Sequence, residues 1–208
     1  MLSMRIFLTL VLLFLNSLTA CAAEQEPTVV VFGDSLSAGY GIDADQAWPV
    51  LLQSRLKQEG YSHRVVNASI SGETTQGGVT RIAPALTDFE PDVVILELGG
   101  NDGLRGFPPA KIRQNLATML AAVNDAGATA VLLGIRIPPN YGPRYTQMFE
   151  DIYEELAEEY DVPWIEFFMD GVALNGALMQ DDGIHPNAEG TRIMTANIYE
   201  TLKLMLVK

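Results

Sequence analysis

Residues 28–37 of this chain read TVVVFGDSLS, and this stretch decides the fold. Its first part, Val29 to Phe32, is continuously apolar and mostly β-branched. A short run of this kind favours a strand that is buried on both faces, as strands are in a parallel sheet. The polar sequence Gly33-Asp34-Ser35 follows at once, so a hydroxyl comes directly after the first expected strand.

Four more short runs of β-branched or aromatic residues follow, and helical patterns lie between them. The runs cover residues 65–66, 93–96, 131–135 and 164–167. The clearest helical pattern runs from Tyr145 to Leu156, where apolar residues recur at helical spacing. Strands that alternate with helices indicate βαβ units with right-handed crossovers. We therefore expect a flavodoxin-like α/β fold, a three-layer α/β/α sandwich with a five-stranded parallel sheet. The functional site of such a sheet lies beyond the carboxyl ends of its strands.

The composition excludes several classes of function. The 208 residues include one cysteine and two histidines, too few for a Cys₄, Cys₂His₂ or His₃ zinc site or for an internal disulfide. Lys and Arg number 13 against 26 Asp and Glu, a net charge of −13, which disfavours binding to nucleic acids. We expect no metal, no cofactor and no nucleic-acid partner.

The N-terminal residues 1–23 have the pattern of a secretory signal peptide. Arg5 precedes a continuous apolar stretch from Ile6 to Leu15, and small residues follow at 20–23. An N-terminal membrane anchor is the alternative, but the apolar stretch is too short to span a bilayer as a helix. We expect residues 24–208 to form one domain and the mature protein to be periplasmic or secreted.

Cys21 leaves the form of the mature N-terminus open. The sequence Ala20-Cys21-Ala22 fits cleavage by ordinary signal peptidase. Residues 18–21, LTAC, also look like the lipobox of bacterial lipoproteins, in which the cysteine is lipidated. The second interpretation would anchor the protein to a membrane, and it is the only membrane association that we expect. In either case the folded domain contains no cysteine nucleophile.

The segments that follow the expected strands, together with residues 181–186, contain the groups of an acyl-transfer site. A serine such as Ser35 is a weak nucleophile and needs a base within hydrogen-bond reach. His63 precedes a strand, at the wrong edge of the sheet for chemistry, so His185 remains by elimination. Asp182 lies three residues before His185 and can orient its imidazole.

An acyl-transfer site also needs donors for the oxyanion that forms on the attacked carbonyl. The backbone N–H of Ser35, the backbone N–H of Gly72 and the side-chain amide of Asn101 are candidates, and spacing alone proves none of them. Each residue has a structural interpretation as well. Ser35 and Asn101 could lie in helix caps, and Gly72 could be a turn residue in the left-handed conformation. His185 before Pro186 could be the N-cap of a helix.

The joint occurrence of four motifs resembles one known family. The motifs are Gly-Asp-Ser-Leu-Ser at 33–37, Gly72, Gly-Gly-Asn-Asp at 99–102 and Asp-Gly-Ile-His-Pro at 182–186. They look like the blocks of the GDSL or SGNH hydrolases, in the family's order. Residues 101–107 and 135–142 are typical of its bacterial thioesterase I, arylesterase and lysophospholipase branch. The resemblance covers about residues 29–198.

This resemblance implies a role for each candidate residue. Ser35 would be the nucleophile, His185 the base and Asp182 the acid that orients it. Ser35, Gly72 and Asn101 would donate to the oxyanion. The implied activity is hydrolysis of acyl esters and thioesters, including aryl esters and lysophospholipids, through an acyl-serine intermediate. The substrate would be a small-molecule or lipid acyl ester, with no cofactor and no obligate protein partner.

In this interpretation the loops at 103–109 and 135–141 would line the acyl groove. Their apolar walls would be Leu104, Phe107, Ile137 and Tyr141. Ordinary loop packing is the alternative for each of them. Two other functions are compatible with the fold. One is a carbohydrate O-acetyl esterase of the same family. The other is a flavodoxin-like ligand-binding module without catalysis, which Asp34 disfavours because a carboxylate there would repel a phosphate.

Overall fold

The computed structural model of the chain describes residues 26–208. The expected signal peptide at 1–23, the alternative lipidation site at Cys21 and the first two residues of the expected domain lie outside the described residues.

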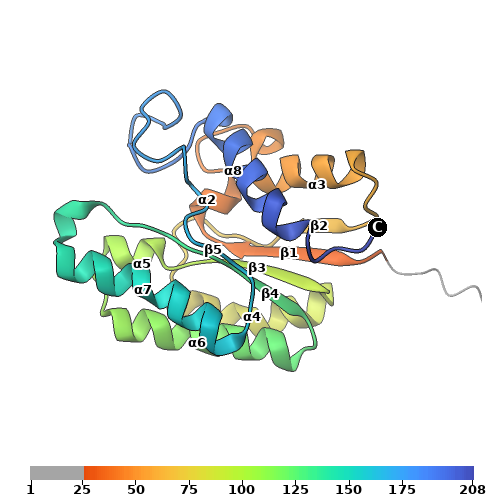
Figure 1. Cartoon of the computed structure of the whole chain (residues 1–208), viewed down its shortest axis with the longest axis horizontal. Coiled ribbons are helices and arrows are strands. Elements are labelled where there is room, and N and C mark those ends of the chain that lie inside the picture. The colour runs from red at the N-terminus through yellow and green to blue at the C-terminus, as the bar shows by residue number, and fades with distance from the viewer. Residues whose placement is uncertain (1–25) are drawn as a thin grey trace, which may run out of the picture.

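Five parallel strands form one sheet in the order β2-β1-β3-β4-β5 (Figure 1). This is the strand order of a flavodoxin-like sheet, so the expected fold class is confirmed. The strands β1 and β3 lie in the middle of the sheet and are buried along their whole length, as their continuous apolar runs predict. The strand bounds are β1 Thr28–Gly33, β2 Arg64–Asn67, β3 Val93–Glu97, β4 Thr129–Leu133 and β5 Trp164–Ile165.

The last two strands both end two residues before their apolar runs do. We expect strands at 131–135 and 164–167, whereas β4 ends at Leu133 and β5 ends at Ile165. The apolar residues beyond these ends have another use. Ile135, Ile137 and Phe167 leave the sheet and line a surface cavity, so their hydrophobicity reflects burial in a cavity wall rather than in the sheet.

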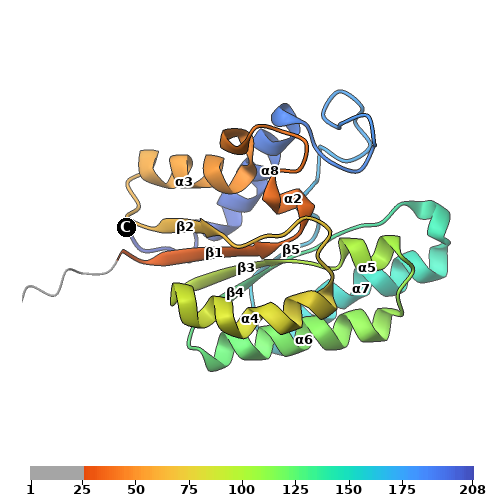
Figure 2. The same cartoon turned by 180° about the vertical axis from the view of Figure 1, so that it is seen from behind.

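Helices cover both faces of the sheet and complete the three layers. The short α2 and the longer α3 and α8 lie on one face, while α4, α5, α6 and α7 lie on the other (Figures 1 and 2). The helical pattern from Tyr145 to Leu156 falls inside α7, as expected. The helix bounds are α2 Ser35–Ala38, α3 Trp48–Gln58, α4 Thr75–Phe89, α5 Gly100–Leu104, α6 Pro109–Asp125, α7 Pro143–Tyr160 and α8 Ala188–Leu202, with 3₁₀ turns η1 Ala44–Gln46 and η2 Pro139–Tyr141.

The carboxyl ends of the strands bring four distant segments together. Ser35 follows β1, the loop with Gly72 follows β2, and Asn101 follows β3. Residues 182–185 come directly before α8 and reach the same edge of the sheet. Within residues 26–208, no helix is both long and apolar enough to cross a lipid bilayer.

Candidate active site

Ser35 is held where β1 passes into α2. Asp34 caps this helix, since its carboxylate oxygen Oδ1 accepts a hydrogen bond of 3.0 Å from the backbone N–H of Leu36. Ser35 is the first residue of the helix and is half-buried, whereas Asp34 is only 2% exposed. The strand and the capped helix together fix the position of the Ser35 hydroxyl at the edge of the sheet.

The imidazole of His185 connects Ser35 to Asp182. Nε2 of His185 lies 2.9 Å from Oγ of Ser35, and Nδ1 lies 2.6 Å from Oδ2 of Asp182. A proton on Nδ1 is favoured because the Asp182 carboxylate can only accept, and Nε2 is then free to accept the hydroxyl proton of Ser35. The three expected residues are therefore in hydrogen-bond contact, in the order Ser35, His185 and Asp182.

The loop with Asp182 is folded around its own carboxylate. Oδ1 of Asp182 accepts from the backbone N–H groups of Ile184 at 2.9 Å and His185 at 3.0 Å. Partial burial acts to raise the pKa of Asp182. The hydrogen bonds from the backbone and ring of His185 and from Ile184 outweigh it and lower the pKa from 3.8 to about 2. Asp182 is thus ionised at neutral pH. The ring of Tyr40 lies next to the imidazole of His185, with 4.6 Å between the ring centroids.

His63 lies directly before β2 and is buried, at the opposite end of that strand from Ser35. The elimination of His63 as a base for Ser35 agrees with this position.

Gly72 and Asn101 face the same space as Ser35. They line one cavity of about 410 Å³ with Ser35, His185 and Tyr40. The side-chain amide of Asn101 donates one hydrogen bond of 2.9 Å to Oδ2 of Asp34. An amide NH₂ has two donors, so the second N–H remains for a ligand in the cavity. Asp34 thereby orients the amide as well as capping α2.

Two buried carboxyl groups, those of Asp34 and Glu97, lie near Ser35 and Asn101. Burial raises the pKa of Asp34 to about 6, although hydrogen bonds from Leu36 and Asn101 act to lower it. Glu97, at the end of β3, is completely buried, and its Oε2 accepts from the hydroxyl of Ser37 at 2.7 Å and from the backbone N–H of Asp34 at 3.2 Å. Burial, and then the charge of Asp34, raise the pKa of Glu97 well above its usual range.

Glu97 was not among the residues expected at the site, and neither was the second role of Asp34. A signal for Glu97 is present, because it interrupts an otherwise apolar run from Val93 to Leu98. A charged residue in a doubly buried strand must have partners, and the sequence does not name them. Tyr40 has no comparable signal.

An apolar cavity continues from the Ser35 cavity along the surface. It has a volume of about 480 Å³, and Leu36, Gly100, Leu104 and Ile184 belong to the walls of both cavities. Most of its other wall residues come from the segments after β4 and β5, and they include Ile135, Ile137, Phe167, Met169, Ala173 and Met179.

The four expected groove residues lie in two different places. Leu104 and Ile137 line the apolar cavity, whereas Phe107 and Tyr141 line neither of the two cavities and are more than a third exposed. The Tyr141 hydroxyl donates to the backbone carbonyl of Leu104 at 2.6 Å, and the Tyr145 hydroxyl donates to that of Phe107 at 2.7 Å. Tyr141 thus connects η2 to the end of α5, and Tyr145 connects the start of α7 to the loop after α5.

No group of three or more His, Cys, Asp and Glu side chains within residues 26–208 is arranged to hold a metal ion.

Comparison with known proteins identifies the family. The model of the GDSL-like lipase/acylhydrolase family matches residues 31–193, a range that holds Ser35, Gly72, Asn101, Asp182 and His185. The chain belongs to this family.

Individual members of the family are similar to this chain over most of their length. Esterase TesA of Pseudomonas aeruginosa is 48% identical over 91% of this chain and 93% of its own. Thioesterase 1/protease 1/lysophospholipase L1 of Escherichia coli strain K12 is 49% identical over 85% of this chain and 83% of its own. A crystal structure of TesA superposes with a TM-score of 0.84 at 47% identity, over 86% of this chain and 99% of that one. As a GDSL-like acylhydrolase, the chain is a serine hydrolase that acts on small-molecule esters.

Proposed function

We propose that this protein hydrolyses acyl esters and thioesters, including aryl esters and lysophospholipids, through an acyl-Ser35 intermediate. The observation that carries the proposal is the chain of hydrogen bonds from Ser35 through His185 to Asp182, next to an apolar cavity of about 480 Å³. The named activities of the relatives, which include an esterase and a thioesterase and lysophospholipase, support the same reaction class.

In the first half-reaction, Oγ of Ser35 attacks the carbonyl carbon while Nε2 of His185 takes the hydroxyl proton. The Asp182 carboxylate stabilises the imidazolium. The backbone N–H groups of Ser35 and Gly72 and the side-chain amide of Asn101 donate to the oxyanion. His185 then protonates the leaving alcohol or thiol, and the acyl group stays on Ser35.

In the second half-reaction, His185 takes a proton from water, which attacks the acyl-Ser35 carbonyl. The same donors stabilise the second oxyanion, and the carboxylic acid leaves as the Ser35 hydroxyl regains its proton. No cofactor enters either half. We assign the acyl chain to the apolar cavity, since its wall residues include Leu104, Ile137 and Met169 and are mostly apolar.

Ser35→Ala tests the mechanism. It should leave a folded protein whose hydrolysis of a p-nitrophenyl ester falls by several orders of magnitude, because the nucleophile is gone. In the unsubstituted protein, an alkyl p-nitrophenyl phosphonate should add its phosphonyl mass to the peptide with Ser35. If Ser35→Ala retains most of the activity, Ser35 is not the nucleophile.

The substrate class is tested with one series of p-nitrophenyl esters from acetyl to palmitoyl, beside an acetylated sugar and a lysophospholipid. Because the apolar cavity has a defined volume, we expect the rate to depend on chain length, with a maximum above acetyl. A flat profile would oppose the assignment of the acyl chain to this cavity. A preference for the acetylated sugar would favour a carbohydrate O-acetyl esterase.

We also propose that the chain is exported, on the pattern of residues 1–23. Mass spectrometry of the mature N-terminus tests this. Cleavage after Ala22 or Ala23 supports a periplasmic or secreted protein, and a diacylglyceryl mass on Cys21 would show a lipoprotein instead.

A further inference from the structure

The loop that carries Gly72 connects β2 to α4 and is not held by packing at Gly72 itself. Gly72 and its neighbour Ser71 are exposed, and Gly72 has a φ of +80°. A Cβ built on Gly72 would meet no atom within 4 Å. A donor to an oxyanion must nevertheless keep its direction, since the hydrogen bond weakens steeply when it is misaligned. The position of the Gly72 N–H therefore depends on contacts made by other residues of the loop.

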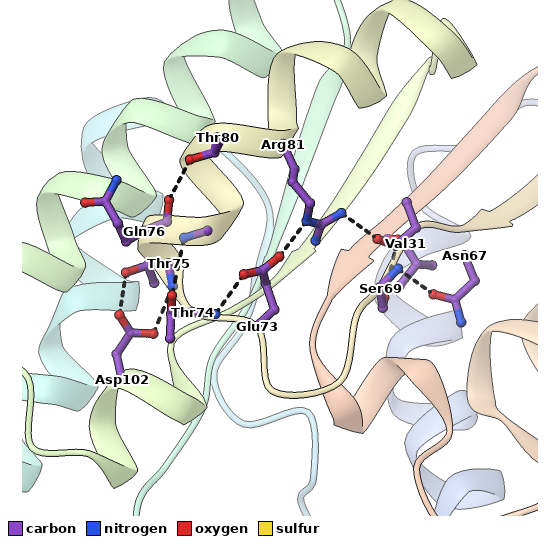
Figure 3. Close-up of polar contacts among 12 residues, drawn as sticks. Val31, Asn67, Ser69, Glu73, Thr74, Thr75, Gln76, Thr80, Arg81 and Asp102 are labelled. Atoms are coloured by element: carbon purple, nitrogen blue, oxygen red, sulfur yellow. Dashed lines mark hydrogen bonds and ion pairs between the residues drawn. The ribbon is translucent and has the colours of Figure 1, made fainter.

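Both ends of the loop are anchored to the sheet edge. The backbone N–H of Ile70 donates to the carbonyl of Gly33 at 3.0 Å, close to Ser35 in the chain. At the far end, Thr75 donates to the two oxygens of the buried Asp102, from its backbone N–H at 2.9 Å and from its hydroxyl at 2.6 Å (Figure 3). These anchors leave residues 71–74 between them.

Arg81, two turns into α4, spans that interval. Its Nε donates to Oε2 of Glu73 at 2.5 Å (Figure 3). Its Nη1 donates to the backbone carbonyl of Ala68 at 3.1 Å. The guanidinium also lies over the ring of Phe32, 4.4 Å from the centroid. One side chain thus connects the start of the loop, the residue after Gly72 and the strand that leads to Ser35.

The carboxylate of Glu73 is placed with both oxygens in use. Oε1 accepts from the backbone N–H of Thr74 at 3.1 Å, while Oε2 takes the Arg81 contact. Only 12% of the Glu73 side chain and 26% of the Arg81 side chain are exposed, so solvent screens this pair less than an exposed one. A Cβ at Gly77 would lie 1.8 Å from Oε1 of Glu73. Gly77 therefore leaves the space that lets Glu73 lie across the first turn of α4.

We propose that Glu73 and Arg81 are positioning residues that hold the Gly72 loop so that the Gly72 backbone N–H stays directed at the oxyanion. This rests on the proposed function, in which Gly72 is a donor. Neither side chain lines the cavity at Ser35, so both act through the loop and not on the substrate. Arg105 adds a weaker contact from the other side, a 3.4 Å hydrogen bond to the Gly72 carbonyl.

The test compares Glu73→Ala and Arg81→Met with Glu73→Gln, which keeps the shape of the side chain and an oxygen acceptor. Removal of a whole oxyanion donor lowers kcat about 10²- to 10³-fold, so a misdirected donor should lower it less, by about 10- to 100-fold. The KM for a p-nitrophenyl ester should stay within about twofold, because ground-state binding is unchanged. Glu73→Gln should recover part of kcat, since it keeps one of the two acceptor oxygens. The double variant Glu73→Ala/Arg81→Met should lose less than the product of the two single losses, since the two side chains share one ion pair.

A matched control separates positioning from a general loss of stability. Arg113 on α6 pairs with Glu155 and Glu159 of α7, away from the site, so Arg113→Met removes an ion-pair cluster without touching the loop. It should leave kcat unchanged. The amide resonance of Gly72 in a ¹⁵N–¹H spectrum is the direct readout. Arg81→Met should shift or broaden it, and Arg113→Met should not.

Two results would overturn the positioning role. One is an unchanged kcat and an unmoved Gly72 resonance in folded Glu73→Ala and Arg81→Met. The other is a loss of kcat in Arg81→Met and Arg113→Met alike, in proportion to the fall in Tm. Failure of the proposed function has a different signature, because the unsubstituted protein would then carry no phosphonyl group on Ser35.

Discussion

The two halves of the site, one with Ser35 and the other with His185, are built in opposite ways. Ser35 and Asn101 lie over the buried carboxyl groups of Asp34 and Glu97, in the middle of the sheet. Asp182 and His185 lie on a loop before α8, where the Asp182 side chain is 38% exposed. Burial raises the pKa of Asp34 to about 6, whereas hydrogen bonds lower the pKa of Asp182 to about 2. Two carboxyl groups of one site are thus shifted in opposite directions by their surroundings.

This difference indicates how each half works. The buried half positions the Asn101 amide through Asp34, whose Oδ2 accepts from this amide while its Oδ1 caps α2. In the proposed mechanism the loop half supplies charge, because an anionic Asp182 stabilises the imidazolium of His185. Substitutions in the two halves should therefore differ in how much they lower kcat and in how they change the pH dependence of stability.

The largest effect in this comparison is expected in the loop half, from Asp182→Asn. An Asn amide can donate to Nδ1 of His185 and so favour the tautomer with the proton on Nε2, which cannot accept from Ser35. We expect kcat to fall about 10³- to 10⁴-fold. Steady-state kinetics on a p-nitrophenyl ester measure it. Asp181→Asn, on the neighbouring exposed residue, is the control and should leave kcat unchanged. Equal losses in the two variants would contradict a special role for Asp182.

A smaller loss is expected in the buried half, from Asn101→Ala. This variant removes one of the three proposed oxyanion donors and leaves the hydrogen bonds of His185 in place, so kcat should fall about 10²- to 10³-fold with little change in KM. The control is Asn124→Ala, on an exposed residue near the end of α6 that precedes β4. If kcat of Asn101→Ala equals that of the unsubstituted protein, Asn101 is not an oxyanion donor.

The smallest effect is on stability, and it has opposite signs in the two halves. Asp34 has a raised pKa, so the folded state binds its proton more tightly than the unfolded state. Stability from Asp34 is present below pH 3.8 and falls as the pH rises to about 6, by up to about 3 kcal/mol. Asp182 has a lowered pKa, so its contribution is present above pH 3.8 and is lost as the pH falls towards 2.

Urea unfolding between pH 2 and 7 measures both contributions. Asp34→Asn should reduce the fall in the free energy of unfolding between about pH 4 and 6, and Asp182→Asn should reduce the loss below about pH 4. Part of the fall in the free energy of unfolding between about pH 4 and 6 should remain in both variants, because the pKa of Glu97 is raised as well. If Asp34→Asn leaves the slope from pH 4 to 6 intact, the buried pair does not titrate as described.

Local sequence was enough to predict the fold class and the residues that meet at Ser35. The continuous apolar run at 29–32 predicts a doubly buried strand, and a parallel sheet brings whatever follows its strands to one edge. Ser35, Gly72 and Asn101 could therefore be expected near each other. Asp182 and His185 are three residues apart, so their contact depends on one short loop and little else. The catalytic roles of these five residues stay proposals.

Only the tertiary structure decided the parts that depend on contacts between distant segments. Glu97 contacts Asp34 and Ser37 across two strands, and Asp34 contacts Asn101 over 67 positions. Leu104 and Ile137 line the apolar cavity while Phe107 and Tyr141 do not, although all four are apolar or aromatic residues of the two expected loops. The reason is physical. The period and run length of apolar residues encode burial, which is a local property, whereas partner choice and side-chain direction depend on how the packed elements meet.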